Sequence, residues 1–332
     1  MASKGKSSKW RPMNVHVRHG SRAEKRYRAR ADRPLKEPAA IAPGISPTPA
    51  HDLRFRGGKV LADLTFTNFY LGGAAAWTAS DVQSVDRALA AAMSDHGLNN
   101  VMVQYFRSMP TSTFKPSHVL PGTPPKKFSQ GDVEKLVASL FGMGSLNGFK
   151  FPATVFNFML PRGSVLNDNS KASGGKQEAA RQRTRVPDDE QSDSLHGLGG
   201  YHGSVHLGSA TVYYAIGVYS EVHNGKENGI AVFDQPWKNV VATFYHELNE
   251  ARTDPDVEDV IRGKPEKMLG WTSNKGEEVG DFPVFEANPL TEVFKEVPLV
   301  AGGTAPIQLQ YSNGVHGPEG PRSTPYPFFK GR

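Results

Sequence analysis

The chain of 332 residues contains no cysteine. This absence excludes disulfide bonds, thiolate nucleophiles and cysteine-based zinc sites. No apolar run approaches 18 residues, so we expect no membrane-spanning helix. The phosphate-loop spacing G-x-x-x-x-G-K-[ST] and the G-x-S-x-G motif are also missing. Their absence argues against a nucleotide-binding loop and against a serine hydrolase of the nucleophile-elbow type.

An apolar segment is lacking behind the basic N-terminus as well, so no secretory signal can be read from the sequence. We therefore expect a cytoplasmic protein by default, with leaderless export as the open alternative.

The net positive charge of the chain lies at one end. Residues 1–37 hold twelve Lys and Arg and three acidic residues, a net charge of +9. The whole chain carries +6, so the remainder carries −3. The sequence thus describes a basic arm on a mildly acidic body. The arm could contact a polyanion such as nucleic acid, whereas the body gives no such indication.

Composition and periodicity divide the chain into two parts. Residues 1–52 are predicted to be a disordered basic arm that continues into a Pro/Ala-rich linker, "KEPAAIAPGISPTPAHD". Residues 53–332 are predicted to form one domain of class α/β or α+β, because strand-like and helical patterns alternate. Strands are expected in 59–73, 99–106, 149–160, 209–222, 229–234 and 305–312, and helices in 78–97 and 129–146.

One polar excursion interrupts this domain. Residues 161–200 are rich in glycine and charge and lack periodicity. A segment of this length suggests a mobile loop, which is either a lid over a cleft or plain disorder.

The segment "FYHELNEARTDPDVED", residues 244–259, carries the chemistry. An apolar face at helical spacing and the stop at Pro255 predict a helix from about residue 236 to 254. His246 and Glu250 then lie one turn apart on one face, where two side chains can share a metal ion. Glu247 lies about 100° around the axis, where it could act as a general base.

This helix resembles the zinc helix of zincin metallopeptidases, with glutamate in place of the second histidine. The resemblance implies a single zincin-like domain with a mixed sheet and a central metal-site helix. It also implies a third ligand, for which Asp254 and Asp256 are the candidates. Thr253 stands where metzincins have a glycine.

A broader resemblance extends beyond the helix. "HELNEARTDP" followed by "GWTSNKGEEVGDF" (270–282) is similar to a pattern in plant exordium-like (phosphate-induced) proteins and their bacterial relatives. Pro283 replaces the cysteine of that pattern. This resemblance implies that Glu278 and Asp281 are further candidate ligands, supplied by the loop after the helix.

Two histidines in "GGYHGSVHLGS" also have i, i+4 spacing. In a strand these positions lie about 13 Å apart, so His202 and His206 are not expected to share one metal ion. His202 remains a candidate contact for substrate or transition state beside the metal, with an ordinary loop histidine as the alternative.

Three hypotheses follow. The first is a zinc-dependent hydrolase, a metallopeptidase in which Glu247 activates water for attack on a peptide or protein substrate. The second is a catalytically inactive zincin-like binding or surface protein with a structural ion, for which Ca²⁺ is the alternative to Zn²⁺. The third is a polyanion- or nucleic-acid-associated protein that acts through its arm. An ordinary charged helix, in which Glu250 pairs with Arg252 or a lysine, is the alternative to all metal sites.

Overall fold

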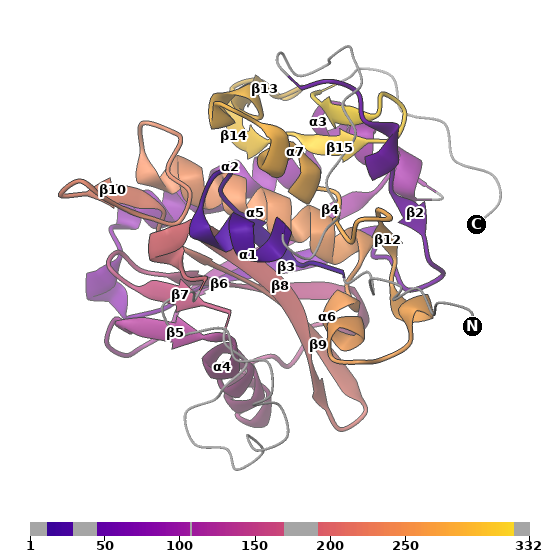
Figure 1. Cartoon of the computed structure of the whole chain (residues 1–332). Helices are drawn as coiled ribbons and strands as arrows, with labels where there is room; N and C mark the ends of the chain where they lie inside the picture. Colours follow the sequence, from indigo (N-terminus) through magenta and orange to yellow (C-terminus); the bar gives the residue numbers. More distant parts are fainter. Residues whose placement is uncertain (1–11, 29–44, 107, 169–191, 322–332) are drawn as a thin grey trace, which may run out of the picture.

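The computed structural model describes residues 12–28, 45–106, 108–168 and 192–321 of the chain. Its architecture is α/β, as the sequence predicts, with helices on both faces of a six-stranded mixed sheet (Figure 1). The strand order is β1-β8-β9-β6-β3-β4. These strands are β1 (Val15–Val17), β3 (Asp63–Tyr70), β4 (Thr111–Val119), β6 (Thr154–Leu160), β8 (Leu198–Leu207) and β9 (Ala210–Val218).

The sheet is parallel except at one edge, where the strand direction alternates. Strands β4, β3, β6 and β9 are parallel to one another. Strand β8 pairs antiparallel with β9, and β1 pairs antiparallel with β8 at the edge. This antiparallel edge is where the candidate site lies.

Seven α-helices lie in the described ranges. They are α1 (Arg22–Arg28), α2 (Ala79–Ser94), α3 (His96–Asn99), α4 (Gln130–Gly142), α5 (Pro236–Thr253), α6 (Val257–Ile261) and α7 (Asp281–Glu286). Figure 1 shows α5 running across one face of the sheet and α4 on the opposite face. Helices α2, α4 and α5 confirm the helices predicted at 78–97, 129–146 and about 236–254, within a few residues at their ends.

Alternation along the strands supplies a core on each face. In β6, Val155 belongs to the core beneath α2 and α5, while Phe156 and Phe158 belong to the core beneath α4. Successive side chains of a strand point to opposite faces, and every residue of this largely apolar strand is buried, so both of its faces are covered. Five short two-stranded sheets surround the main one; they pair β2 (Arg54–Phe55) with β12 (Trp271–Thr272), β5 (Lys127–Ser129) with β7 (Val165–Asn167), β10 (Glu221–His223) with β11 (Lys226–Asn228), β13 (Phe294–Pro298) with β14 (Thr304–Gln308), and β15 (Gln310–Ser312) with β16 (Gly317–Glu319).

Two predicted strands are absent. Residues 99–106 instead form a 3₁₀ helix, Asn100–Tyr105, that continues from α3. Asn99 supports the turn, since its side-chain amide donates to the carbonyls of Ala92 and Asp95. Residues 229–234 form no strand either, because the side chain of Asn239 accepts hydrogen bonds from the amides of Val232 and Phe233 before α5 begins.

Part of the expected disordered arm is folded. Residues 12–28 form β1 and α1, and Met13, Val15 and Val17 are buried in the core beneath α4. The prediction of disorder was wrong for these residues because the many basic residues of the arm outnumber the few alternating apolar ones. The rest of the arm to residue 44 lies outside the described residues, as does 169–191 of the predicted loop. The described ends of that loop form β7, a 3₁₀ turn (Ser194–His196) and the start of β8.

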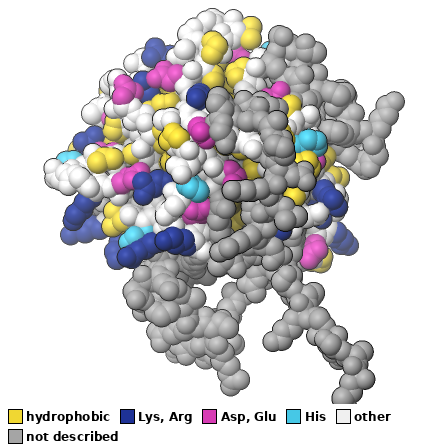
Figure 2. Space-filling view, turned by 45° about the horizontal axis from the view of Figure 1, so that its top comes forward, with side chains coloured by type: hydrophobic (Ala, Val, Ile, Leu, Met, Phe, Trp, Pro, Cys, Tyr) yellow, Lys and Arg dark blue, Asp and Glu magenta, His cyan; other side chains and the backbone are white. Residues whose placement is uncertain are grey.

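Acidic and basic side chains lie side by side on the described part of the face in Figure 2. None of the helices in the described ranges combines the length and the apolarity that crossing a bilayer requires.

Candidate metal centre

Helix α5 supplies the first three side chains of the site. His246, Glu247 and Glu250 are all completely buried. Nε2 of His246 lies 3.1 Å from Oε2 of Glu250, one helical turn further along. The spacing predicted from the sequence therefore brings these two groups together. Arg252, the predicted ion-pair partner of Glu250 in the ordinary-helix alternative, instead donates to the carbonyl oxygens of Ala62 and Thr111.

The loop after α5 folds back and adds two carboxylates. The backbone amide of Gly280 donates to Oε1 of Glu250 (3.1 Å), and the amide of Glu278 donates to Oδ2 of Asp281 (2.9 Å). Close packing requires glycine at position 280, since a Cβ there would lie 2.2 Å from Nδ1 of His246. Glu278 and Asp281 are both completely buried beside the helix.

Strand β8 contributes a histidine from the sheet. Nδ1 of His202 lies 3.3 Å from Oε2 of Glu247 and 3.8 Å from Oε2 of Glu250. Its Nε2 lies 3.6 Å from Oε2 of Glu278. His206, four residues along, is half exposed and pairs with Asp259, so the two histidines do not converge.

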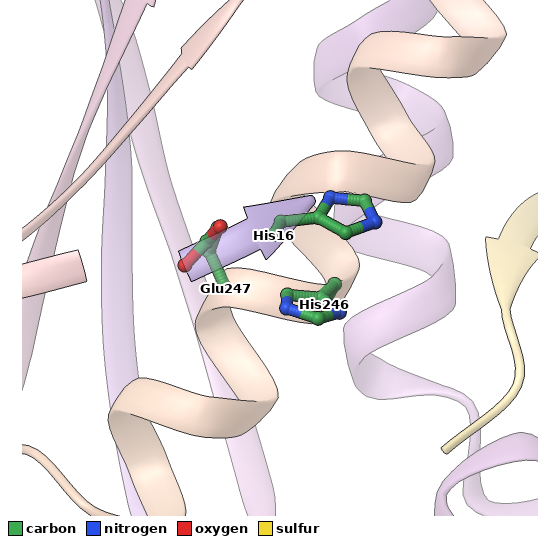
Figure 3. Close-up of side chains that lie close together, drawn as sticks. All are labelled: His16, His246 and Glu247. Atoms are coloured by element: carbon green, nitrogen blue, oxygen red, sulfur yellow. The ribbon is translucent and has the colours of Figure 1, made fainter. Parts of the chain in front are cut away.

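The edge strand β1 contributes a histidine that the sequence analysis missed. The ring of His16 stacks on the ring of His246, with centroids 4.0 Å apart and planes inclined by 17°. Figure 3 shows His16 reaching from β1 over His246 and Glu247 of α5. The alternation in "MNVHVRH" was the available signal, because it predicts a strand with His16 on one face and valines on the other.

Three overlapping groups have ligand atoms close enough to share a cation. Within each group the nitrogen and oxygen atoms lie within 4.8 Å of one another. The groups are His16, His246 and Glu247; His202, Glu247 and Glu250; and His246, Glu250 and Asp281.

Two of the other predicted ligands lie differently. Oδ1 of Asp254 accepts from the amide of Gly270 (2.8 Å), and this bond ties the end of α5 to the loop. Asp256 does not join any of the three groups. Its carboxylate accepts from the hydroxyl of Tyr213 (2.8 Å). Tyr213 belongs to β9, so this bond holds the carboxylate of Asp256 against the sheet.

Gln308 determines which nitrogen of His246 carries the proton. Its Nε2 donates to the carbonyls of Gly280 (2.7 Å) and Leu309 (3.1 Å), so Oε1 faces Nδ1 of His246 at 2.6 Å. An amide oxygen only accepts, so the hydrogen-bond network assigns the proton to Nδ1 and a lone pair to Nε2. Burial lowers the pKa of His246 to about 4, which keeps the ring neutral near pH 7. No local pattern in the sequence marks Gln308 as a member of the site.

The carboxylates of the site repel one another in a dry environment. Burial, followed by the charges of neighbouring carboxylates, raises the pKa of Glu247, Glu278 and Asp281 well above the usual value. Burial also raises the pKa of Glu250 and Asp254. Among the described residues, no lysine or arginine forms an ion pair with any of the five. Burial lowers the pKa of His202 to about 3, so this ring cannot supply a positive charge.

Many polar atoms of the site have no hydrogen-bond partner among the described residues. They are both ring nitrogens of His16, Nε2 of His246, Oε1 of Glu247, Oε2 of Glu250, Oδ2 of Asp254, both oxygens of Glu278 and Oδ1 of Asp281. A buried polar atom without a partner costs about 1–3 kcal/mol, and more when it is charged. Convergent lone pairs from nitrogen and oxygen are the donor set that a divalent cation requires, so these residues could hold one.

Comparison of the chain with protein-family models, with curated proteins and with solved structures finds no match in any of the three.

Proposed function

We propose that this protein is a metal-dependent hydrolase of zincin-like type that cleaves peptide or other amide bonds. The observation that carries the proposal is the lone pair on Nε2 of His246, which faces Oε2 of Glu250 at 3.1 Å. Two acceptors at this distance repel each other unless a cation or a proton lies between them. The unpartnered oxygen of Asp281 completes the same group.

Zn²⁺ is the ion that the donor set favours. His246, Glu250 and Asp281 would hold it, since zinc accepts imidazole nitrogen and carboxylate oxygen in one site. Ca²⁺ takes oxygen ligands, so a histidine in the group argues against it. A zinc ion bound there would supply Lewis-acid polarisation of a carbonyl and would make a water molecule more acidic.

Glu247 would accept and return the proton during hydrolysis, and His202 would support it. Oε1 of Glu247 has no hydrogen-bond partner, and Oε2 lies 3.3 Å from His202. Burial and the charges of Glu250 and Asp281 raise the pKa of Glu247, which makes its ionised carboxylate a stronger base than a free one. A general base needs such a pKa to accept a proton from water and return it to a leaving amine. His202 is placed to orient the carboxylate.

Complete burial of the site favours a second candidate. All the ligand groups have exposed fractions of zero, and a structural ion needs no access for substrate. The protein would then be a catalytically inactive binding or surface protein with the same ion. The polyanion hypothesis depends on the arm, most of which lies outside the described residues.

Substitution of Glu247 by glutamine separates the two candidates. For a hydrolase, the zinc-loaded Glu247→Gln variant keeps its metal but loses at least about 100-fold in the rate of amide hydrolysis, measured on a library of quenched fluorescent peptides. Glu266→Gln, an exposed carboxyl on the same protein, is the matched control and keeps its rate. Full metal occupancy with no hydrolysis of any peptide by the parent would support the structural ion instead.

A further inference from the structure

The outer edge of β8 is occupied by a segment from the far N-terminal end of the chain. Strand β1 pairs antiparallel with β8, with Val15 opposite Tyr201, His16 opposite Gly200 and Val17 opposite Leu198. Without β1, this stretch of β8 would present free backbone amides and carbonyls. Such an edge binds extended peptides by strand addition, which uses main-chain hydrogen bonds and few side chains.

The occupied stretch lies directly at the candidate metal centre. His202, one of the grouped residues, is on β8 itself. The carbonyl of His202 accepts from the side-chain amide of Asn14 (2.5 Å), the residue before β1. On either side of β1, the amide of Met13 donates to Gly276 (2.8 Å) and that of Arg18 to Gly197 (2.7 Å). The segment is therefore held by main-chain pairing along the edge together with buried side chains on one face, as an extended peptide bound by strand addition would be.

His16 is the side chain that this segment directs at the metal groups. It points away from the core that buries Val15 and Val17 and stacks on His246. Its two ring nitrogens have no hydrogen-bond partner, and its exposed fraction is 0%. An imidazole buried without partners next to candidate metal-binding groups is suited to be a further ligand of that site.

Two glycines of β8 leave the space that such a side chain needs. A Cβ at Gly199 would lie 3.2 Å from Nδ1 of His16. A Cβ at Gly200 would lie 3.1 Å from Oε1 of Glu247 and 2.5 Å from the carbonyl of Ile216. Strand β8 can therefore pass close to the carboxylate of Glu247 only because it has glycine at these positions. The space that the missing side chains leave is occupied by His16 of the adjacent strand β1.

We propose that the edge of β8 from Leu198 to His202 is the binding site for an extended polypeptide substrate, and that residues 13–18 occupy this site as an internal ligand with His16 over the metal groups. This inference rests on the proposed function. It explains how a hydrolase site can be completely buried, since substrate and the β1 segment use the same edge. The structure then represents the closed form of the protein.

A nicked form of the full chain tests the proposal. A recognition sequence for a site-specific protease is inserted between Ala39 and Ala40, the zinc-loaded protein is cut, and a fluorescent peptide of residues 12–28 is offered in exchange for the released fragment. The expected result is that the parent peptide binds at least about tenfold more tightly than its His16→Ala form, and that this difference disappears when the metal is removed. An Arg22→Ala peptide, changed at an exposed position of α1, is the control and binds as the parent does.

A second measurement covers the case in which the nicked protein unfolds. In the uncut chain loaded with Co²⁺, His16→Ala is expected to change the visible absorption bands of the ion, whereas His206→Ala leaves them unchanged. Equal binding of the parent and His16→Ala peptides with and without metal, or identical Co²⁺ spectra, would overturn this inference and leave the proposed function intact. If the full chain binds no metal, the proposed function itself fails.

Discussion

The lone pair on Nε2 of His246 faces the carboxylate oxygen Oε2 of Glu250 across 3.1 Å inside the protein. The orientation follows from Gln308, whose amide oxygen engages the proton on the other ring nitrogen. Neither of the facing atoms has a hydrogen-bond partner. In the metal-free protein a proton on Glu250 can fill this position, because burial raises the pKa of that carboxyl. On the proposed function, a divalent cation would replace the proton here.

Metal binding should therefore release protons from carboxyls and not from histidines. His246 and His202 have pKa values lowered to about 4 and about 3, so both rings are already neutral above pH 5. Burial and mutual repulsion raise the pKa values of the carboxyls, so these groups keep their protons to higher pH than free carboxyls do. We expect the apparent zinc affinity to increase steadily from pH 5.5 to pH 8. Calorimetry in buffers with different ionisation enthalpies measures the released protons; an affinity that is constant over this range would contradict the prediction.

The metal-free protein should lose stability over the same pH range. A carboxyl with a raised pKa in the folded state keeps its proton to higher pH than it does in the unfolded chain, where the pKa is about 4. The folded state then binds more protons, and the free energy of unfolding decreases as the pH rises above about 4. Urea denaturation between pH 5 and pH 8 checks this sign, with the zinc-loaded protein as the control. The loaded protein should not show the same decrease, because the ion stabilises the ionised carboxylates.

Glu250→Gln should have opposite effects on the two forms. In the metal-free protein the new amide can donate to Nε2 of His246 and still accept from Gly280 through its oxygen. At a pH where Glu250 is ionised, we expect an increase of about 1 kcal/mol in the free energy of unfolding, since an unpartnered acceptor gains a donor. The same change removes a proposed metal ligand, so zinc should no longer raise the melting temperature. Gln308→Glu is the reverse substitution. It removes the donor to Gly280 and adds a buried carboxyl, so it should lower the free energy of unfolding of the metal-free protein. A destabilised metal-free Glu250→Gln would refute the assigned tautomer.

Gly280→Ala should disrupt the site by contact alone. The added Cβ would lie 2.2 Å from Nδ1 of His246, so the ring or the loop must move. We expect a loss of several kcal/mol in the free energy of unfolding, or zinc binding weakened at least about tenfold. Gly142→Ala at the end of α4 is the control, because its Cβ would meet nothing within 4 Å. That substitution should be neutral or stabilise the protein by up to about 1 kcal/mol. Equal behaviour of the two variants would show that the packing around His246 is loose.

Local patterns in the sequence predicted the parts of the site that lie on one element. The apolar face of α5 and the stop at Pro255 gave the helix, and helical spacing paired His246 with Glu250. The loop residues Glu278 and Asp281 were found only through resemblance to a longer pattern. His16 and Gln308 could not be predicted as members of the site. They reach it through strand pairing and loop packing across more than 60 residues of sequence, and such contacts have no local signature.

Short apolar runs also explain where the predicted secondary structure differs from the observed one. "NNVMVQYF" is buried on all sides, so its composition fits a strand or a buried helical turn equally well. The hydrogen bonds of Asn99 to the preceding helix decide in favour of the turn. In the arm, charge averaged over 37 residues outweighed the short alternation around His16. A window of seven residues would have predicted β1, although not its position next to α5.

Metal content by elemental mass spectrometry tests the central claim most directly. The protein is purified in full length as the parent, as His246→Ala and as His206→Ala, a matched histidine that lies half exposed on β8 outside the metal groups. We predict close to one zinc per chain in the parent and in His206→Ala, and a loss of the metal in His246→Ala. The absence of metal from the parent, even after incubation with zinc, would contradict the claim that these buried groups form a metal centre.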